Sequence, residues 1–388
     1  MKLRFSMRWL LGGFLLSVIV VGWMALNVRR YEQGRAFLAR NEWVYSSSWP
    51  NYSFYPIEPE SDGPVVDFLN TALGRREFQT SFVLIGEEQT EGYMFAAPKP
   101  PAPLPPDFDA ELSAACRELD SLPIRPVTLT FTSATCPTGL RDVQWVRHPT
   151  VLMAAETSLV GFPFERLDSL ETLHVTSGAG RAADFAAATF PKLEEAVLAA
   201  DWLDSAVLAR IVTSPRLRVL VVGPTPLRPN MSAEERLAAK PQWSDADLQV
   251  IGNCSSLETL ELGALKLTGA GLAELHRCRR LREIELLDLE VHTSLDPLLA
   301  HPTAESITLS GNIRGASLPT ITQLGPALTK LDATGTLLTP EMHARLGELC
   351  AARRIEFHGG ETTLLEEPAP EERSPEEPSP DSSASPAE

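Results

Sequence analysis

The side chains with the widest chemical repertoire in this 388-residue chain are its seven histidines and five cysteines. The cysteines stand at positions 116, 136, 254, 278 and 350. No two of them have the Cys-x-x-Cys spacing that commonly holds a zinc ion or a redox dithiol. The histidines are scattered, without the His-Glu-x-x-His pair of zinc hydrolases. The sequence therefore predicts no metal site and no cofactor.

Motifs for nucleophilic catalysis and for phosphate binding are also missing from the sequence. There is no Gly-x-Ser-x-Gly, no GxxxxGK[ST] and no Asp-rich calcium loop. The glycines of Ser177-Gly178-Ala179-Gly180 are typical of a turn after a strand. Residues 29–120 are too short, and too poor in paired polar residues, to supply a catalytic domain. We therefore expect a protein that is not an enzyme.

What the sequence does contain is an apolar pattern that returns about every 24 residues. Each copy has apolar residues at a first position n, at n+3 and at n+5. The first positions are Leu170, Leu193, Leu217, Leu257, Leu281, Ala304, Leu328 and Ala352. The single long step, from Leu217 to Leu257, contains one repeat and a 16-residue insertion. A fixed period of this size is typical of a solenoid.

Strand geometry explains the spacing within each copy. Residues two apart in a strand leave the same face, so Leu260 and Leu262 point together into a core. One short strand cannot bury that face alone, whereas stacked copies form a parallel sheet with a continuous core. Leu272 and Leu275 then suit a short helix or irregular turn on the outer side. Cys254 and Cys278 fall in an outer-turn column, where a small buried thiol packs well.

The chain resembles the leucine-rich repeat family in its bacterial variants, which read Leu-x-x-Leu-x-Leu-x-x-x-x-Leu-Thr-x-x-x-Leu. The segments from Leu260 to Leu272 and from Leu331 to Met342 match best, and the match extends over about residues 169–358. Weaker upstream copies are Ile124/Val127/Leu129, and Val151 with Met153 after His148. The resemblance implies an α/β solenoid, a curved horseshoe with a parallel sheet on its concave side and helices or turns on its convex side. It also implies a protein that binds other proteins.

Charge is distributed unevenly along the chain. The 34 basic and 51 acidic residues give a net charge of −17. Residues 1–40 carry an excess of basic side chains, residues 361–388 are strongly acidic, and the part between them is acidic as well. An acidic surface repels phosphate backbones, so we expect no nucleic-acid partner.

The amino end contains an apolar run from Trp9 to Val28 without a charged residue. As a helix these residues would span about 30 Å, enough for a hydrocarbon core. The sequence therefore predicts a single-pass membrane protein with an uncleaved signal anchor. In that topology the repeats lie on the extracytoplasmic side, in the periplasm or at the cell surface. A cleaved signal peptide is the alternative, although no small-x-small cleavage pattern precedes Arg29-Arg30.

These patterns predict five segments. They are a basic cytoplasmic end (1–8), the transmembrane anchor (9–28), a juxtamembrane helix and irregular linker (29–64), the leucine-rich repeat domain (65–360) and a disordered acidic tail (361–388). Within the repeat domain we expect a capping region at about 65–97, a Pro-rich insertion at 98–106 and a loop insertion at about 224–240.

The side chains between the core positions offer a candidate ligand site. Strand alternation directs n+2 and n+4 to the concave face, where an apolar patch is followed by three acids on neighbouring strands. The site comprises Val197, Val219, Val221, Glu261, Glu283 and Glu285. Such a surface, next to the 224–240 loop, suits a protein or peptide with a basic edge. Valines that only favour strands and acids that only keep the surface soluble are the simpler explanation. The alternative function is a structural envelope scaffold or spacer without a selective ligand.

Overall fold

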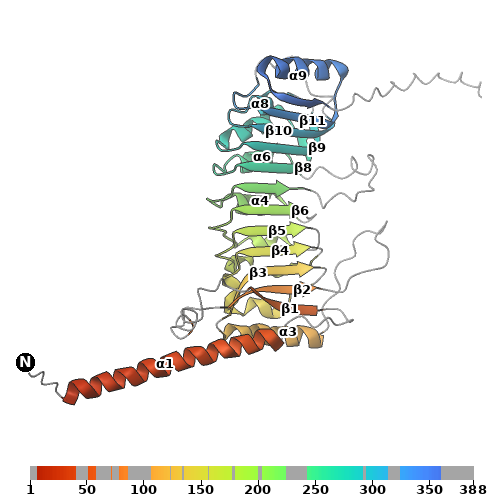
Figure 1. Ribbon diagram of the computed structural model, residues 1–388. Helices are drawn as coiled ribbons and strands as arrows, with labels where there is room; N and C mark the ends of the chain where they lie inside the picture. Colours follow the sequence, from red (N-terminus) through yellow and green to blue (C-terminus); the bar gives the residue numbers. More distant parts are fainter. Residues whose placement is uncertain are drawn as a thin grey trace, which may run out of the picture.

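Consecutive strands pair with one another along the whole computed structural model, forming one twelve-stranded sheet in the order β1 to β12 (Figure 1). The structure describes residues 7–40, 51–57, 71, 78–85, 106–122, 124–132, 135–155, 157–176, 180–199, 203–223, 243–291, 294–312 and 324–359. β1 is antiparallel to β2, and every later pair is parallel. Because each strand pairs only with its neighbours in sequence, the chain is a solenoid, as the repeat period predicts.

The strands have four or five residues from β4 to β7 and seven to nine residues from β8 to β11. Their bounds are β1 Asn51–Ile57, β2 Phe78–Ile85, β3 Ile124–Thr132, β4 Val151–Ala155, β5 Thr172–Thr176, β6 Glu195–Ala199, β7 Val219–Val222, β8 Thr259–Leu267, β9 Glu283–Val291, β10 Ser306–Asn312, β11 Lys330–Leu337 and β12 Glu356–Gly359.

Helical segments connect the strands on one side of the sheet. They are α1 Met7–Arg40, α3 Pro106–Asp120, α4 Ser205–Val212, α6 Asp245–Ile251, α7 Gly269–Glu274, α8 Asp296–Leu299 and α9 Pro340–Arg353, with 3-10 helices η1 Thr138–Arg141, η2 Gln144–Arg147, η3 Phe164–Arg166, η4 Ala182–Phe185 and η5 Leu275–Arg277. Of these, α4, α6 and α8 lie behind the sheet, whereas α3 lies at the lower end of the stack and α9 at its upper end (Figure 1). The core lies between these two layers.

The repeat residues fill that core as their spacing predicts. Leu173, Leu220 and Leu260 at n+3 are fully buried, and so are their partners at n+5, such as Leu262 and Leu286. The resulting hydrophobic cluster is continuous from one end of the stack to the other.

Behind β2 to β6 the core is aromatic. A chain of rings connects successive repeats, with centroid distances between 3.8 and 6.3 Å. Its members are Phe82, Trp145, Phe131, Phe162, Phe164, Phe185 and Phe190. From β3 to β6 the connecting segments are the 3-10 helices η1 to η4, and in none of them does the side chain of the N-cap residue form a capping hydrogen bond. A single 3-10 turn places few side chains against the sheet, so large rings occupy the remaining volume.

Behind β7 to β12 most of the connecting segments are α-helices with polar caps. Asp204 accepts hydrogen bonds from two backbone N–H groups at the start of α4. Ser244 and Asp247 form a capping box on α6, and the Thr339 hydroxyl caps α9. Such caps satisfy the N–H groups that a helix start leaves unbonded.

The amino-terminal helix α1 projects away from the first strands of the sheet (Figure 1). Its carboxyl end is anchored. Phe37 and Leu38 are buried, and the Arg40 guanidinium lies 2.6 Å from the Glu118 carboxylate of α3. The expected continuation of this helix beyond Arg40, to residue 45, lies outside the described residues.

The membrane prediction is wrong. Among the described residues no helix combines the length and the low polarity that crossing a bilayer requires. A single-pass membrane protein with extracytoplasmic repeats is therefore not supported.

The predicted irregular linker contains a strand. Residues 51–57, Asn-Tyr-Ser-Phe-Tyr-Pro-Ile, form β1, the first edge of the sheet. Proline has no N–H for a ladder, yet Pro56 is tolerated because an edge strand bonds on one side only. β2 lies within the capping region expected at about 65–97.

Three repeats have a different register from the predicted one. In β4 the buried residues are Leu152 and Ala154, whereas Met153 is 41% exposed. A shift of one residue exchanges the two faces of a strand, so the predicted core pair Val151 and Met153 lies on the exposed face. β4 is apolar at all five positions, which leaves its sequence pattern ambiguous.

In the other two strands the observed register is shifted by two residues from the predicted one. Such a shift keeps each side chain on the same face of the sheet but pairs it with a different residue of the neighbouring strand. Leu129 pairs with Leu152, so the core pair of β3 is Leu129 and Phe131, not Val127 and Leu129. At the other end Phe357 pairs with Leu331, where the spacing predicts Ile355. The cause at that end is α9, whose 14 residues lengthen the last repeat until Arg354 ends it in a left-handed conformation.

Several predicted segments fall outside the described residues. These are residues 1–6, most of the capping region expected at about 65–97, the Pro-rich stretch 98–105, the insertion at about 224–240 and the tail 361–388. Pro106, the last residue of the predicted Pro-rich insertion, is the first residue of α3. The division into five segments stays a prediction.

Candidate functional site

The face of the sheet that carries no helices, called the open face below, presents two rows of side chains. The first row runs through Val151, Thr172, Glu195, Val219, Thr259, Glu283, Ser306, Lys330 and Glu356. The second row runs through Met153, His174, Val197, Val221, Glu261, Glu285, Thr308, Asp332 and His358. Neighbours within a row are about 4.8 Å apart. All six predicted site residues lie in these rows.

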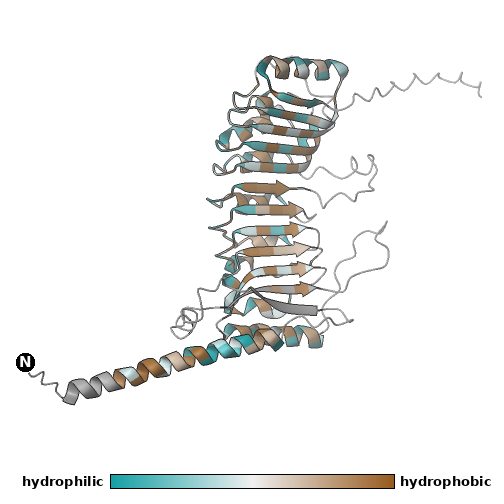
Figure 2. Ribbon diagram, in the orientation of Figure 1, coloured by the Kyte–Doolittle hydropathy of each residue, from teal (hydrophilic) through white to brown (hydrophobic). Residues whose placement is uncertain are grey.

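The amino-terminal part of the open face is apolar over β4, β6 and β7. Val197 pairs with Val221, and Val219 lies in the adjacent row, all three partly exposed. Val151 and Met153 extend this surface to β4. The sequence reading missed both, because the register error assigned them to the core. β6 and β7 stand out as predominantly hydrophobic strands in Figure 2.

The carboxyl-terminal part of the site is acidic. Glu261 on β8 pairs directly with Glu285 on β9, and Glu283 lies in the first row of β9. The Thr259 hydroxyl donates a hydrogen bond of 3.3 Å to the Glu283 carboxylate. Like charges on directly opposed residues of neighbouring strands destabilise a sheet. The pair therefore costs folding free energy when no cation lies nearby.

The same arrangement shifts the pKa of Glu261. Partial burial, and then the Glu285 carboxylate, raise the pKa of Glu261 above its usual value. Both causes disfavour the charged form. A cationic group placed between these two carboxylates would relieve the repulsion.

Asp332, further along the second row, is stabilised in its charged form by hydrogen bonds. The Thr334 N–H and hydroxyl donate hydrogen bonds of 3.0 and 2.8 Å to its carboxylate. The backbone hydrogen bond is the largest cause of the lowered pKa of Asp332. Within the described residues no comparable donor to Glu261 or Glu285 is recorded. Of the acids in this row, these two are the ones that a ligand could stabilise.

A hydrogen bond between two side chains lies inside the apolar part. His174 Nε2 is 2.8 Å from the Glu195 carboxylate on the next strand. This contact satisfies both polar groups within the chain. It leaves the surrounding valines and Met153 as the apolar surface of this half.

Along the edge where the strands begin, charges of opposite sign alternate in a ladder that sequence reasoning missed. The ladder comprises Glu194, Arg218, Glu258, Arg282 and Glu305, one residue per repeat, connected by backbone N–H to C=O bonds. Arg218 and Glu258 form an ion pair of 2.9 Å, and Arg282 and Glu305 one of 3.7 Å. All five residues occupy position n+1 of their repeats, and this shared position is the sequence signal that could have revealed the ladder.

The cysteines are buried thiols, as their spacing predicts. The thiols of Cys254 and Cys278 lie 3.8 and 3.4 Å from the carbonyl oxygens of Leu217 and Ile251. Burial raises the pKa of Cys278 to about 12, so the reactive thiolate is almost absent at neutral pH. In the part of the chain that the structure describes, no three metal-ligating side chains gather.

Comparison with known proteins finds similarity among solved structures. No family model matches the chain, and no curated protein matches it. Among solved structures, an internalin from Listeria monocytogenes is similar with 14% sequence identity. The similarity covers 64% of this chain and 72% of that chain, with a TM-score of 0.35. A similarity this distant supports no inference about ligands. Any such inference rests on the open face itself.

Proposed function

We propose that this chain is a repeat solenoid that binds another protein through its open face, and that its repeats are of the leucine-rich type. The family resemblance rests on the residue pattern between about 169 and 358. Binding on such a surface uses preformed side chains on rigid strands and requires no reactive group. The absence of enzymatic activity and of a nucleic-acid partner stay predictions.

The proposal rests on one observation, the division of the open face into an apolar part and an acidic part. Its apolar side chains and its unrelieved Glu261–Glu285 pair adjoin at the β7–β8 pairing. A solvated sheet face needs neither feature, and together they fit a ligand with an apolar segment beside a basic one. The partner is therefore a protein or peptide with a basic edge.

The test uses two single substitutions in the proposed site. Val221→Asp places a charge in the apolar part, and Glu285→Lys reverses a charge in the acidic part. The probe is a synthetic 12-residue peptide with an apolar half and a lysine-rich half, and binding is followed by fluorescence anisotropy. We expect each variant to weaken the affinity by about tenfold or more, the equivalent of about 1.4 kcal/mol.

Matched controls are available on the opposite side of the molecule. Val160 and Glu165 are exposed in the turn region before and within η3. Val160→Asp and Glu165→Lys make the same chemical changes and should leave binding unchanged. Circular dichroism and thermal unfolding must show all four variants folded. Equal affinity of the site variants and the controls, or equal binding of a glutamate-rich counterpart of the peptide, would refute the proposal.

A further inference from the structure

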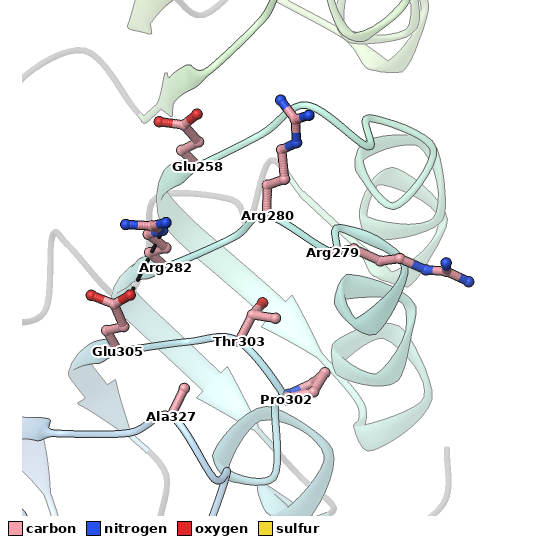
Figure 3. Close-up of a pocket in the computed structure, with 8 residues that line it drawn as sticks. All are labelled: Glu258, Arg279, Arg280, Arg282, Pro302, Thr303, Glu305 and Ala327. Carbon is pink, nitrogen blue, oxygen red and sulfur yellow. Dashed lines mark ion pairs between the residues drawn. The ribbon is translucent and has the colours of Figure 1, made fainter.

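A second surface with the opposite charge lies at the edge where β8 to β11 begin. It is a pocket of about 450 Å³ (Figure 3). Its walls are Glu258, Arg279, Arg280, Arg282, Pro302, Thr303, Glu305 and Ala327. Three arginines against two acids give this pocket a positive charge, in a chain whose net charge is −17.

Both acids in the pocket are already engaged by guanidinium groups. Glu258 pairs with Arg218, and Glu305 with Arg282. The hydrogen bond from Arg218 is the largest cause of the lowered pKa of Glu258, and the charges of Arg282 and Arg280 add to it. Arg279 and Arg280 are exposed, and no ion pair to either is recorded within the described ranges.

The arrangement of the arginines indicates the shape of the ligand. Arg280 extends on the side of Glu258, whereas Arg279 extends away from it along the rim (Figure 3). Their guanidinium groups are spread out rather than converging on one point. A single small anion is bound best by converging donors, while an extended chain with several carboxylates matches separated ones.

We propose that the occupant of this pocket is the acidic segment 361–388 of the same chain, bound as an acidic peptide. This segment carries nine acids and one arginine. It follows β12, three strand spacings from β9, which corresponds to about 14 Å along the stack. Twenty-eight extended residues reach up to about 90 Å, so the segment is long enough to cross the edge of the sheet.

Attachment to the same chain strengthens a weak contact of this kind. A tethered segment has an effective concentration on the order of 1 mM. Contacts between arginines and carboxylates at the surface are individually weak and fall with ionic strength. The bound segment would therefore occupy the pocket at low salt and be displaced by a more acidic competitor.

The experiment uses the full-length chain in two forms. In one form the nine acids of residues 361–388 are replaced by their amides (Glu→Gln, Asp→Asn), which keeps the length of the segment. The probe is a labelled synthetic peptide with the native sequence 361–388. We expect the probe to bind the neutralised chain about tenfold more tightly than the native chain, because the native segment competes with it.

Charge reversal locates the contact. Arg279→Glu with Arg280→Glu, made in the neutralised chain, should remove probe binding. The matched control is Arg181→Glu with Arg210→Glu, which reverses two exposed arginines, one at the start of η4 and one in α4. Both double variants must give the circular dichroism of the parent chain.

Three results would overturn the proposal. They are equal probe binding to the native and neutralised chains, equal loss with both double variants, and displacement of the probe by inorganic phosphate as readily as by unlabelled peptide. The last result would assign the pocket to small anions. None of them bears on the open face, where Val221→Asp and Glu285→Lys are tested separately.

Discussion

Between β2 and β6 the space behind the sheet is filled by aromatic rings, whereas between β7 and β12 it is filled mainly by leucines on capped α-helices. The two halves also differ on the open face, where valines and Met153 give way to Glu261, Glu283 and Glu285. Both changes occur near β7. The comparison teaches that one repeat pattern accommodates two packing solutions, because each repeat has only to match its neighbours.

The halves should respond differently to loss of a core side chain, and this is the largest effect we expect. Phe164 contacts Phe162 and Phe185 at ring centroid distances of 4.8 and 3.8 Å. Phe164→Ala should destabilise the protein by about 4 kcal/mol, and the matched Leu272→Ala by about 3 kcal/mol, in urea unfolding.

Amide hydrogen exchange shows which repeats each substitution destabilises. Phe164→Ala should speed amide exchange in β4 to β6, while β9 to β11 change little. A uniform increase along the stack would contradict the division into halves.

A smaller effect is expected from the polar contact that connects α4 with α6. Asp247 is 3% exposed and accepts hydrogen bonds from the Ser244 N–H, the Ser244 hydroxyl and the Ser205 hydroxyl. Asp247→Ala leaves these donors without a buried acceptor, and should reduce the unfolding free energy by about 2 kcal/mol. Asp204→Ala, which removes a helix cap alone, should cost about 1 kcal/mol. Equal losses would show that the α4–α6 contact adds nothing beyond capping.

The smallest effect concerns the acidic part of the open face. Since the pKa of Glu261 is raised in the folded chain, its contribution to stability is fully present below the unfolded value of 4.5 and is lost as pH rises through the folded pKa. Glu261→Gln should therefore stabilise the free protein at pH 7 by about 0.5 kcal/mol or less, because a half-exposed carboxylate is screened by solvent. The gain should vanish below pH 4.5. A gain independent of pH would mean that charge is not its cause.

The repeat pattern predicts much of the fold correctly, since local residues dictate it. Between Leu170 and Ala333 the predicted core positions are buried and the predicted rows are paired. Alternation of one apolar face with one polar face fixes each register there. The candidate site follows directly, because its six residues occupy the alternate positions of these strands.

The predicted register is wrong in strands whose apolar pattern is compatible with more than one pairing. β4 is apolar on both faces, and β3 offers Val127, Leu129 and Phe131 in alternation, so two pairings satisfy the same local pattern. Met153 and Val151 were lost from the predicted site for this reason. The β1 strand was missed because its tyrosines, serine and proline have no repeat copy to compare with.

The sequence by itself determined that this chain is a stack of strands with leucines inside, because short strands that recur about every 24 residues bury their apolar face by stacking on one another. Only the tertiary structure decided which residue lies beside which across repeats. It placed Glu261 against Glu285, joined the aromatic rings behind β2 to β6, and aligned the arginines of the pocket. These contacts join residues a full repeat or more apart, and their geometry depends on how neighbouring strands pair rather than on any local sequence.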